Sequence, residues 1–210
     1  MSEFRQAQPA GAQAQPAGAL SDEAESWPVV GTEDLHRDHW VVAFRSDMVQ
    51  RPGHPEDAFR RLVVEDPGAV IVLAIDDDER VVVIHQYRHP VQMRLVELPA
   101  GKLDVDGEDP VVAGQRELRE EVGLRAREWT HLMTTFASPG ITAETHALYL
   151  ARGLEEVDRD FDPHHEEADM TVDRVPFAEL LDAVLDGRVA DAPLATAVLA
   201  YEALKARGRL

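Results

Sequence analysis

The chain has 210 residues and a formal net charge of −19, with 21 basic against 40 acidic residues. Nucleic acid and anionic membranes are bound through a positively charged surface patch, and this net negative charge argues against one. We therefore expect neither as a partner. The absence of cysteine excludes disulfides and thiolate metal sites. Without an apolar signal core or a run of membrane-span length, the sequence predicts a cytoplasmic protein with one well-buried domain plus extensions.

The N-terminal region divides into two predicted parts. Residues 6–12 and 13–19 repeat the string QAQPAGA, a composition that buries too little apolar surface to offset the lost backbone entropy. We therefore predict a disordered tail over residues 1–25. Strand-like segments at 40–49 and 59–65 flank a turn-rich stretch, which predicts a small antiparallel unit over residues 26–66.

The main domain is predicted over residues 67–210. Segments 69–75 and 80–87 are rich in Val and Ile and flank the acidic turn DDDE, which predicts a hairpin of core strands. Arg88 follows at the strand end, where its guanidinium could bind phosphate, although an exposed structural arginine would look the same. A short strand at 94–98 then leads into a glycine loop.

A carboxylate-rich helix follows this loop. Asp109 can cap its start, Pro110 fits the first turn and Gly123 ends it. Within it Glu117 and Glu121 lie four residues apart and therefore share one face.

Glu120 lies on the same face, three residues from Glu117. Like charges repel, so a positive partner is expected there. Arg116 can pair with Glu120, and carboxylate oxygens suit Mg²⁺, with Mn²⁺ as a substitute. A glycine at position 101 would let the backbone approach a metal or a phosphate. The alternative is a solvated acidic helix.

Strands are predicted after the helix at 129–136 and 147–151. The turn Ser138-Pro139-Gly140 between them joins a rigid residue to a permissive one, so it could hold backbone groups beside a ligand, although an ordinary turn would use the same residues. A final strand at 170–175 and helices at 177–185 and 193–206 complete a mixed α/β protein, and Asp191 is predicted to cap the start of the second helix.

The polar segment 160–170, DFDPHHEEADM, contains candidates for a general base. Hydrolysis assisted by a metal needs a base to take a proton from the attacking water, and a loop carboxylate can do this. Glu166 and Glu167 are the candidates. The adjacent histidines His164 and His165 are more simply explained as solvated loop residues.

Residues 101–124 resemble the Nudix box, which reads Gly, five residues, Glu, seven residues, then Arg-Glu-aliphatic-x-Glu-Glu-x-Gly-aliphatic. The match is close from Glu108 onward, but six residues instead of five separate Gly101 from Glu108. Length changes are tolerated in loops. The resemblance implies the Nudix α/β/α sandwich with a mixed sheet over residues 35–207.

The resemblance also implies site roles. Glu117 and Glu121 are implied to be metal ligands, Glu120 a ligand or close support, and the Ala100 carbonyl the completing ligand. Glu97, in VELPAG, resembles a position that contacts substrate or supports the metal site.

Three features resemble the ADP-ribose pyrophosphatases within the Nudix family. Pro139 falls 16 residues beyond Gly123, the segment QYR ends in Arg88, and HHEEADM is similar to actinobacterial enzymes. The resemblance implies hydrolysis of ADP-ribose to AMP and ribose 5-phosphate. It favours Glu167 over Glu166 as the base and implies that Arg88 orients phosphate or adenosine.

The same resemblance implies a homodimer in which the N-terminal strand unit helps to enclose the adenosine. Trp40 is a candidate to stack on the base, although buried aromatics are the commoner outcome. One alternative is a Nudix pyrophosphatase for NADH, nucleotide sugars or nucleoside triphosphates. Another is a non-catalytic nucleotide-binding regulator, which the intact box carboxylates disfavour.

Overall fold

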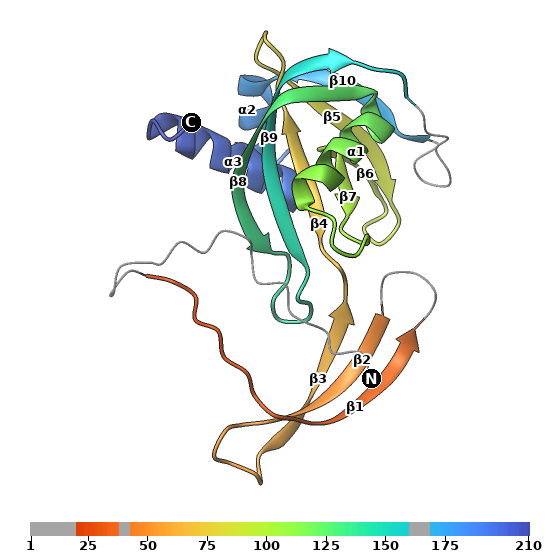
Figure 1. Cartoon of the computed structure of the whole chain (residues 1–210), viewed down its shortest axis with the longest axis vertical. Coiled ribbons are helices and arrows are strands. Elements are labelled where there is room, and N and C mark those ends of the chain that lie inside the picture. The colour runs from red at the N-terminus through yellow and green to blue at the C-terminus, as the bar shows by residue number, and fades with distance from the viewer. Residues whose placement is uncertain (1–19, 38–42, 160–168) are drawn as a thin grey trace.

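The computed structural model describes residues 20–37, 43–159 and 169–210 (Figure 1). The strands are β1 Val29–Arg37, β2 Ala43–Gln50, β3 Ala58–Glu65, β4 Ala69–Ala74, β5 Arg80–Arg88, β6 Met93–Glu97, β7 Ala100–Lys102, β8 Leu124–Phe136, β9 Thr145–Glu156 and β10 Thr171–Pro176. The helices are α1 Pro110–Val122, α2 Phe177–Leu185 and α3 Ala192–Ala206. Within these ranges no helix is both long and apolar enough to cross a membrane.

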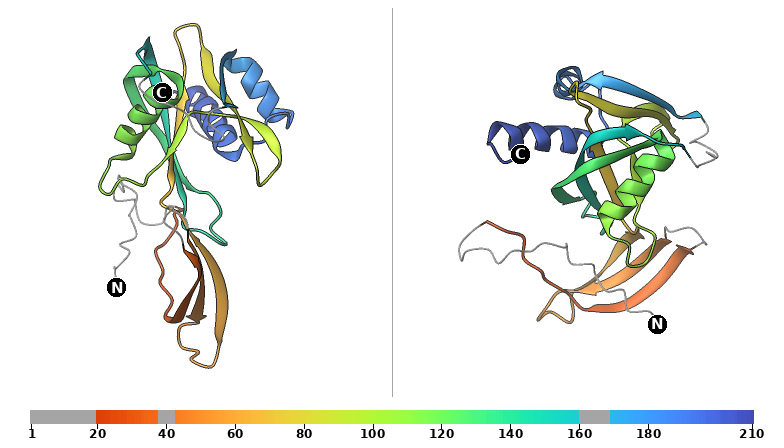
Figure 2. Two further views of the ribbon diagram at one scale, coloured as in Figure 1. Left: turned by 90° about the vertical axis from the view of Figure 1, so that its right-hand side faces the viewer. Right: turned by 45° about the horizontal axis from the view of Figure 1, so that its top comes forward.

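The body of the protein is built around a four-stranded sheet in the order β7-β4-β9-β8. Strand β4 pairs parallel with β9 and antiparallel with β7, so the sheet is mixed. Successive side chains of a strand point to opposite faces. Accordingly, Val70 and Val72 join the core cluster that contains Leu118 of α1, whereas Ile71 and Leu73 join the cluster of α2 and α3. The predicted α/β/α sandwich is confirmed, with helices on both faces (Figure 2).

The predicted hairpin of β4 and β5 is wrong. The two strands belong to different sheets, because β5 lies between β10 and β6 in a separate three-stranded sheet. The isolated bridge between Ile75 and Val81 beside their turn is not continued into a ladder between the two described strands. A strand has two edges for hydrogen bonding, and both edges of β4 are already taken by β7 and β9. The chain therefore turns after Ile75 and starts a new sheet.

A third sheet, in the order β1-β2-β3, lies apart from the body and is joined to it where β3 leads into β4 (Figure 1). Its first strand was not predicted, because every residue of β1 is exposed and the segment lacks an apolar alternation. The amide of Val64 on β3 donates to the carbonyl of Ile141 at 2.8 Å, which ties the sheet to the loop between β8 and β9. The division into separate domains stays a prediction.

Candidate active site

Helix α1 is held rigidly in place against the sheet. Asp109 caps its start by accepting from the amide of Val111, and Gly123 ends it in the left-handed conformation at φ 67°. Gly114 lies so close to β4 that an added Cβ would be 3.1 Å from a methyl group of Val70. Tight packing of this kind fixes the height of the helix above the sheet and therefore the positions of its carboxylates.

Gly101 on β7 makes room for the first carboxylate of α1. A Cβ at this position would overlap Cγ, Cδ and Oε1 of Glu117, well inside the 3.0 Å that real Cβ atoms respect. The glycine predicted to let the backbone approach a ligand therefore lets Glu117 lie directly on the β7 backbone. This contact places the box carboxylate against the strand that precedes the glycine loop.

Glu121 is tied to the same strand. Its Oε2 accepts a hydrogen bond of 2.9 Å from the amide of Ala100, and the residue is only 8% exposed. A carboxylate that accepts a backbone amide is fixed in direction as well as position. The predicted ligands Ala100, Glu117 and Glu121 are thus brought together by α1 and β7.

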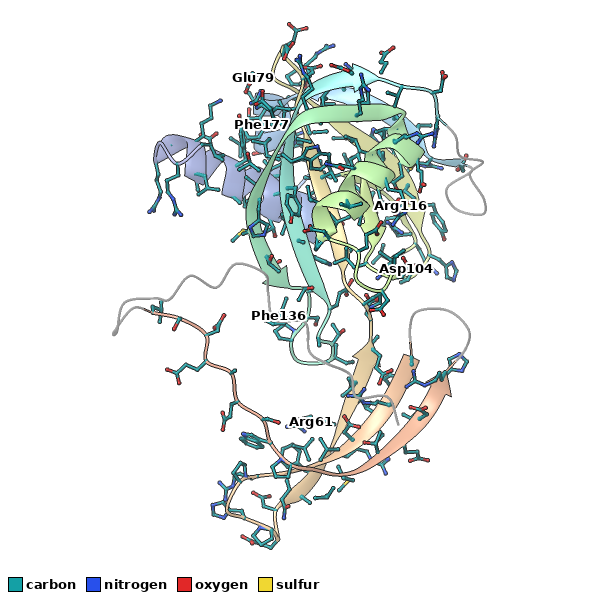
Figure 3. The ribbon with its side chains drawn as sticks, viewed as in Figure 1. Arg61, Glu79, Asp104, Arg116, Phe136 and Phe177 are labelled. Atoms are coloured by element: carbon teal, nitrogen blue, oxygen red, sulfur yellow. The ribbon has the colours of Figure 1, made fainter. Side chains whose placement is uncertain are left out.

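Arg116 supplies the positive charge expected beside this cluster (Figure 3). Its guanidinium lies 2.6 Å from Glu117, 3.3 Å from Glu120 and 3.3 Å from Glu108. Burial alone would lower the pKa of Arg116, but its bonds to Glu108 and Glu117 raise the pKa overall. The cation therefore stays charged at any accessible pH and gathers three carboxylates around one point.

The donor set fits a hard divalent ion. Within the described ranges no three acidic or histidine side chains converge closely enough to hold a metal as they stand. Arg116 lies among the carboxylates where a cation is required, and the surrounding donors are carboxylate oxygens, the ligands that Mg²⁺ prefers. These carboxylate oxygens, including those of Glu117 for which Gly101 leaves space, are the type of ligand that fits a hard cation.

Arg88 and Glu97 form a two-pronged ion pair next to the box. Nε of Arg88 donates to Oε1 of Glu97 at 2.8 Å and its terminal nitrogen donates to Oε2 at 2.6 Å. Glu97 is 7% exposed and Arg88 43%. The bond to Glu97 raises the pKa of Arg88. The guanidinium fork predicted to bind phosphate is thus engaged by a buried carboxylate, with part of the side chain still open to solvent.

Asp191, the N-cap of α3, adds a charge near this pair. Its side chain accepts from the amide of Leu194 at 2.9 Å. Burial raises the pKa of the Asp191 carboxyl; Glu97 raises it further, while Arg88 lowers it. The cap was predicted, but its nearness to Arg88 was not, because more than 100 residues separate them in sequence.

The predicted turn at residues 138–140 lies apart from the carboxylate cluster. Ser138, Pro139 and Gly140 are exposed, and the amides of Ile141 and Thr142 both donate to the Ser138 carbonyl at 3.0 Å. The loop that carries the turn contacts β3 through the bridge between Thr142 and Val64. Its predicted part in substrate binding stays a prediction.

The predicted site residues Trp40, Glu166 and Glu167 lie outside the described ranges. The neighbouring His164 and His165 lie outside them too. The described residues that flank residues 160–168 are anchored near the site. Nε of Arg159 donates to the carbonyl of Glu120 at 2.7 Å, and Arg94 on β6 donates to the Asp169 carbonyl at 2.9 Å and pairs with its carboxylate.

Comparison with known proteins agrees with this fold and site. The model of the NUDIX domain matches residues 65–197. The ADP-ribose pyrophosphatase of Mycobacterium tuberculosis (strain ATCC 25618 / H37Rv) is 44% identical over 175 residues, 83% of each chain. The methanol dehydrogenase activator of Bacillus methanolicus is 36% identical over 146 residues, 70% of this chain and 72% of its own.

A crystal structure of an ADP compounds hydrolase has the same fold. It aligns with a TM-score of 0.71 at 22% identity over 90% of this chain and all of that one. Together with this fold, the NUDIX match and the 44% identical relative identify a hydrolase that acts on pyrophosphate bonds. The chain belongs to the Nudix family. ADP-ribose pyrophosphatases of this family generally use a divalent metal ion.

Proposed function

We propose that this protein hydrolyses the pyrophosphate bond of ADP-ribose to give AMP and ribose 5-phosphate. The observation that carries the proposal is the assembled box, in which Arg116 gathers three carboxylates while Glu121 is fixed by Ala100. The choice of substrate is supported by the 44% identity to a protein named ADP-ribose pyrophosphatase over most of both chains.

Glu117, Glu121 and Glu120, with the Ala100 carbonyl, would hold Mg²⁺, and Mn²⁺ could substitute for it. When bound, the ion neutralises pyrophosphate charge and lowers the pKa of a water ligand. The chain itself contributes the fixed geometry, because Gly101 and Gly114 set the separation of α1 from β7 and β4. Fixed donors need no reorganisation during the reaction.

Glu167, or else Glu166, would take the proton from the attacking water. Support comes from the two anchors of the segment that contains them. Arg159 is bonded to the carbonyl of Glu120 in the box helix, and Asp169 is bonded to Arg94 on β6. The described residues on either side of this segment are thus bonded to the box helix and to β6, and this supports a base drawn from the segment.

Arg88 and Glu97 would bind the phosphates or the adenosine, together with Gly101 and the turn Ser138, Pro139 and Gly140; Trp40 would stack on the base. A homodimer would complete the site through the β1–β3 sheet. The sheet exposes several large apolar side chains: Val29 53%, Val30 59%, Leu35 45% and Leu62 42%. Exposed apolar area of this kind is what a second copy would cover. We further propose that the protein acts in the cytoplasm.

The first experiment measures turnover of ADP-ribose, NADH, a nucleotide sugar and dGTP in Mg²⁺. Wild type is compared with Glu121→Gln, Glu167→Gln and the control Glu128→Gln, which removes a carboxylate from an exposed position on β8. We expect wild type and the control to prefer ADP-ribose, and both site variants to lose about 100-fold or more in kcat while remaining folded.

Each other result has a definite meaning. Preference for another compound would replace the substrate but keep the box chemistry. Retained activity in Glu167→Gln with loss in Glu166→Gln would move the base by one residue. If wild type binds these nucleotides without hydrolysing any, the regulator alternative is correct.

A further inference from the structure

Lys102 is one of two lysines in a chain with 19 arginines, and it directly follows Gly101 at the end of β7. Its Nζ lies 2.7 Å from Oδ2 of Asp66 and 3.4 Å from Oε1 of Glu144. The Asp66 side chain is 8% exposed, whereas Lys102 is 42% exposed. A single ammonium thus bridges a buried carboxylate to a second carboxylate far from it in sequence.

Lys102 lies on the face of the sheet opposite the box helix. In the β4–β7 ladder Gly101 pairs with Val70 and Lys102 pairs with Ala69. Val70 belongs to the core on the α1 side, and Ala69 to the core on the α2 and α3 side. Removing the ammonium would therefore leave the contacts of Glu117 with Gly101 intact.

Asp66 belongs to the joint between the N-terminal sheet and the body, which is formed by residues 66–68. Its Oδ1 accepts from the amide of Gly68 at 2.9 Å, and the Gly68 carbonyl accepts from Leu103 at 3.0 Å. Gly68 has φ 91°, and a Cβ there would lie 2.8 Å from the carbonyl oxygen of Thr145. The joint is thus packed tightly against β9, and only glycine fits its centre.

Glu144 closes the loop that carries the turn at residues 138–140. Its carbonyl accepts from Ala137 at 2.9 Å, and its carboxylate also lies 3.4 Å from His146. The same loop holds β3 through the bond from Val64 to Ile141. Phe136, at the loop's start, lies on the side of the body toward the N-terminal sheet (Figure 3).

We propose that Lys102 is a positioning residue for substrate binding: it locks the joint and the 137–144 loop to the strand that begins the box. The role in substrate binding rests on the proposed function. Among the described residues, the ion pairs of Lys102 are with Asp66 and Glu144 and not with the box carboxylates, so it acts on the surfaces that would enclose the substrate. Its loss leaves the buried Asp66 carboxylate without this cation, and an uncompensated buried charge loosens the segment that carries it.

The test compares Lys102→Met, which keeps the apolar stem, with Lys102→Arg, which keeps the charge. The control is Lys205→Met, which removes the other lysine, on α3, and its 3.4 Å pair with Glu79 in the turn before β5. We measure steady-state hydrolysis of ADP-ribose and amide hydrogen exchange of the folded protein. Exchange reports local opening without reference to any substrate.

For Lys102→Met we expect exchange at Val64, Gly68 and Leu103 to rise about tenfold, the effect of losing a hydrogen bond to a charged group. The amides of Ala113 and Leu118 in α1 should not change. KM should rise about tenfold with kcat within about twofold of wild type, because substrate positioning is lost and the reacting groups are not. Lys102→Arg should restore both values, and Lys205→Met should match wild type.

Unchanged exchange at the joint in Lys102→Met would overturn the proposal whatever the substrate is. A fall in kcat at constant KM would also overturn it, because that result places Lys102 in the chemistry. If ADP-ribose is not hydrolysed even by wild type, the proposed function fails separately, and the KM comparison is made with the compound that wild type prefers.

Discussion

The substitution Gly101→Ala should have a small effect on the stability of the fold and a large effect on the rate of hydrolysis. The added Cβ overlaps Glu117, so the side chain must rotate away from β7. Leaving its rotamer costs about 0.5–1.5 kcal/mol, and loss of the pair with Arg116 costs up to about 1 kcal/mol. Replacing glycine returns about 0.4–1 kcal/mol through the unfolded chain. We therefore expect a net loss of stability below about 2 kcal/mol.

The effect on catalysis should be much larger. A displacement of about 1 Å at a reacting group can cost about 100-fold in rate, and Glu117 has to move by at least that much to clear the new methyl group. Steady-state hydrolysis of ADP-ribose in Mg²⁺, with thermal unfolding of the same samples, measures both quantities. Glu117→Ala removes the atoms that clash, so adding Gly101→Ala to that variant should change little.

The reasoning would be refuted by Gly101→Ala with kcat within about threefold of wild type. It would also fail if Gly101→Ala destabilised the Glu117→Ala variant as much as it destabilises wild type, since the clash would then lie elsewhere. Non-additive effects are expected only between residues in contact.

Three further predictions follow from the charged residues around the site. Arg116→Gln should destabilise the metal-free protein by about 1–3 kcal/mol because the carboxylates around it then repel, and Mg²⁺ should raise its Tm more than that of wild type; equal Mg²⁺ shifts would contradict this. Arg88→Lys should lose about 1 kcal/mol and raise KM, because an ammonium cannot reproduce the two parallel bonds to Glu97, whereas unchanged unfolding and kinetics would show that the fork is dispensable. Asp191→Asn should keep the cap on Leu194, since Asn caps as well as Asp. Burial raises the pKa of Asp191 above its ordinary 3.8, so the folded state binds more protons than the unfolded state in the window above that value, and wild type loses stability as pH rises through it. Denaturation from pH 3 to pH 7 should therefore show the Asn variant gaining on wild type with rising pH; parallel curves would refute the assignment.

Local regularities made much of the fold predictable. The caps at Asp109 and Asp191 are read directly from residue type, and both are observed. The predicted range of α2, 177–185, is the observed one. The pairing of Arg116 with Glu120 needed only the four-residue spacing of a helix, because neighbours on one face of a helix are set by its pitch.

Partner choice between strands was not predictable in the same way. Adjacent Val-rich segments around an acidic turn favour a hairpin, yet β4 pairs with β9, which lies about 75 residues along the chain. The local sequence pattern predicts that a segment is an extended, buried strand. It does not predict which other strand will pair with each of its two edges. Strands β1 and β7 were missed for a related reason, since one is wholly exposed and the other has three residues.

The sequence by itself therefore determined the helix caps, the shared face of the box carboxylates and the chemistry of their expected ligand, because each depends on residues within a few turns of one another. The tertiary structure alone decided that Gly101 makes room for Glu117, that the Arg88 fork meets Glu97, and that Lys102 meets carboxylates 36 and 42 residues away. Those contacts require strands from different parts of the chain to lie side by side in one register. Register is a property of the whole packed sheet, because every strand must bury its apolar face at once.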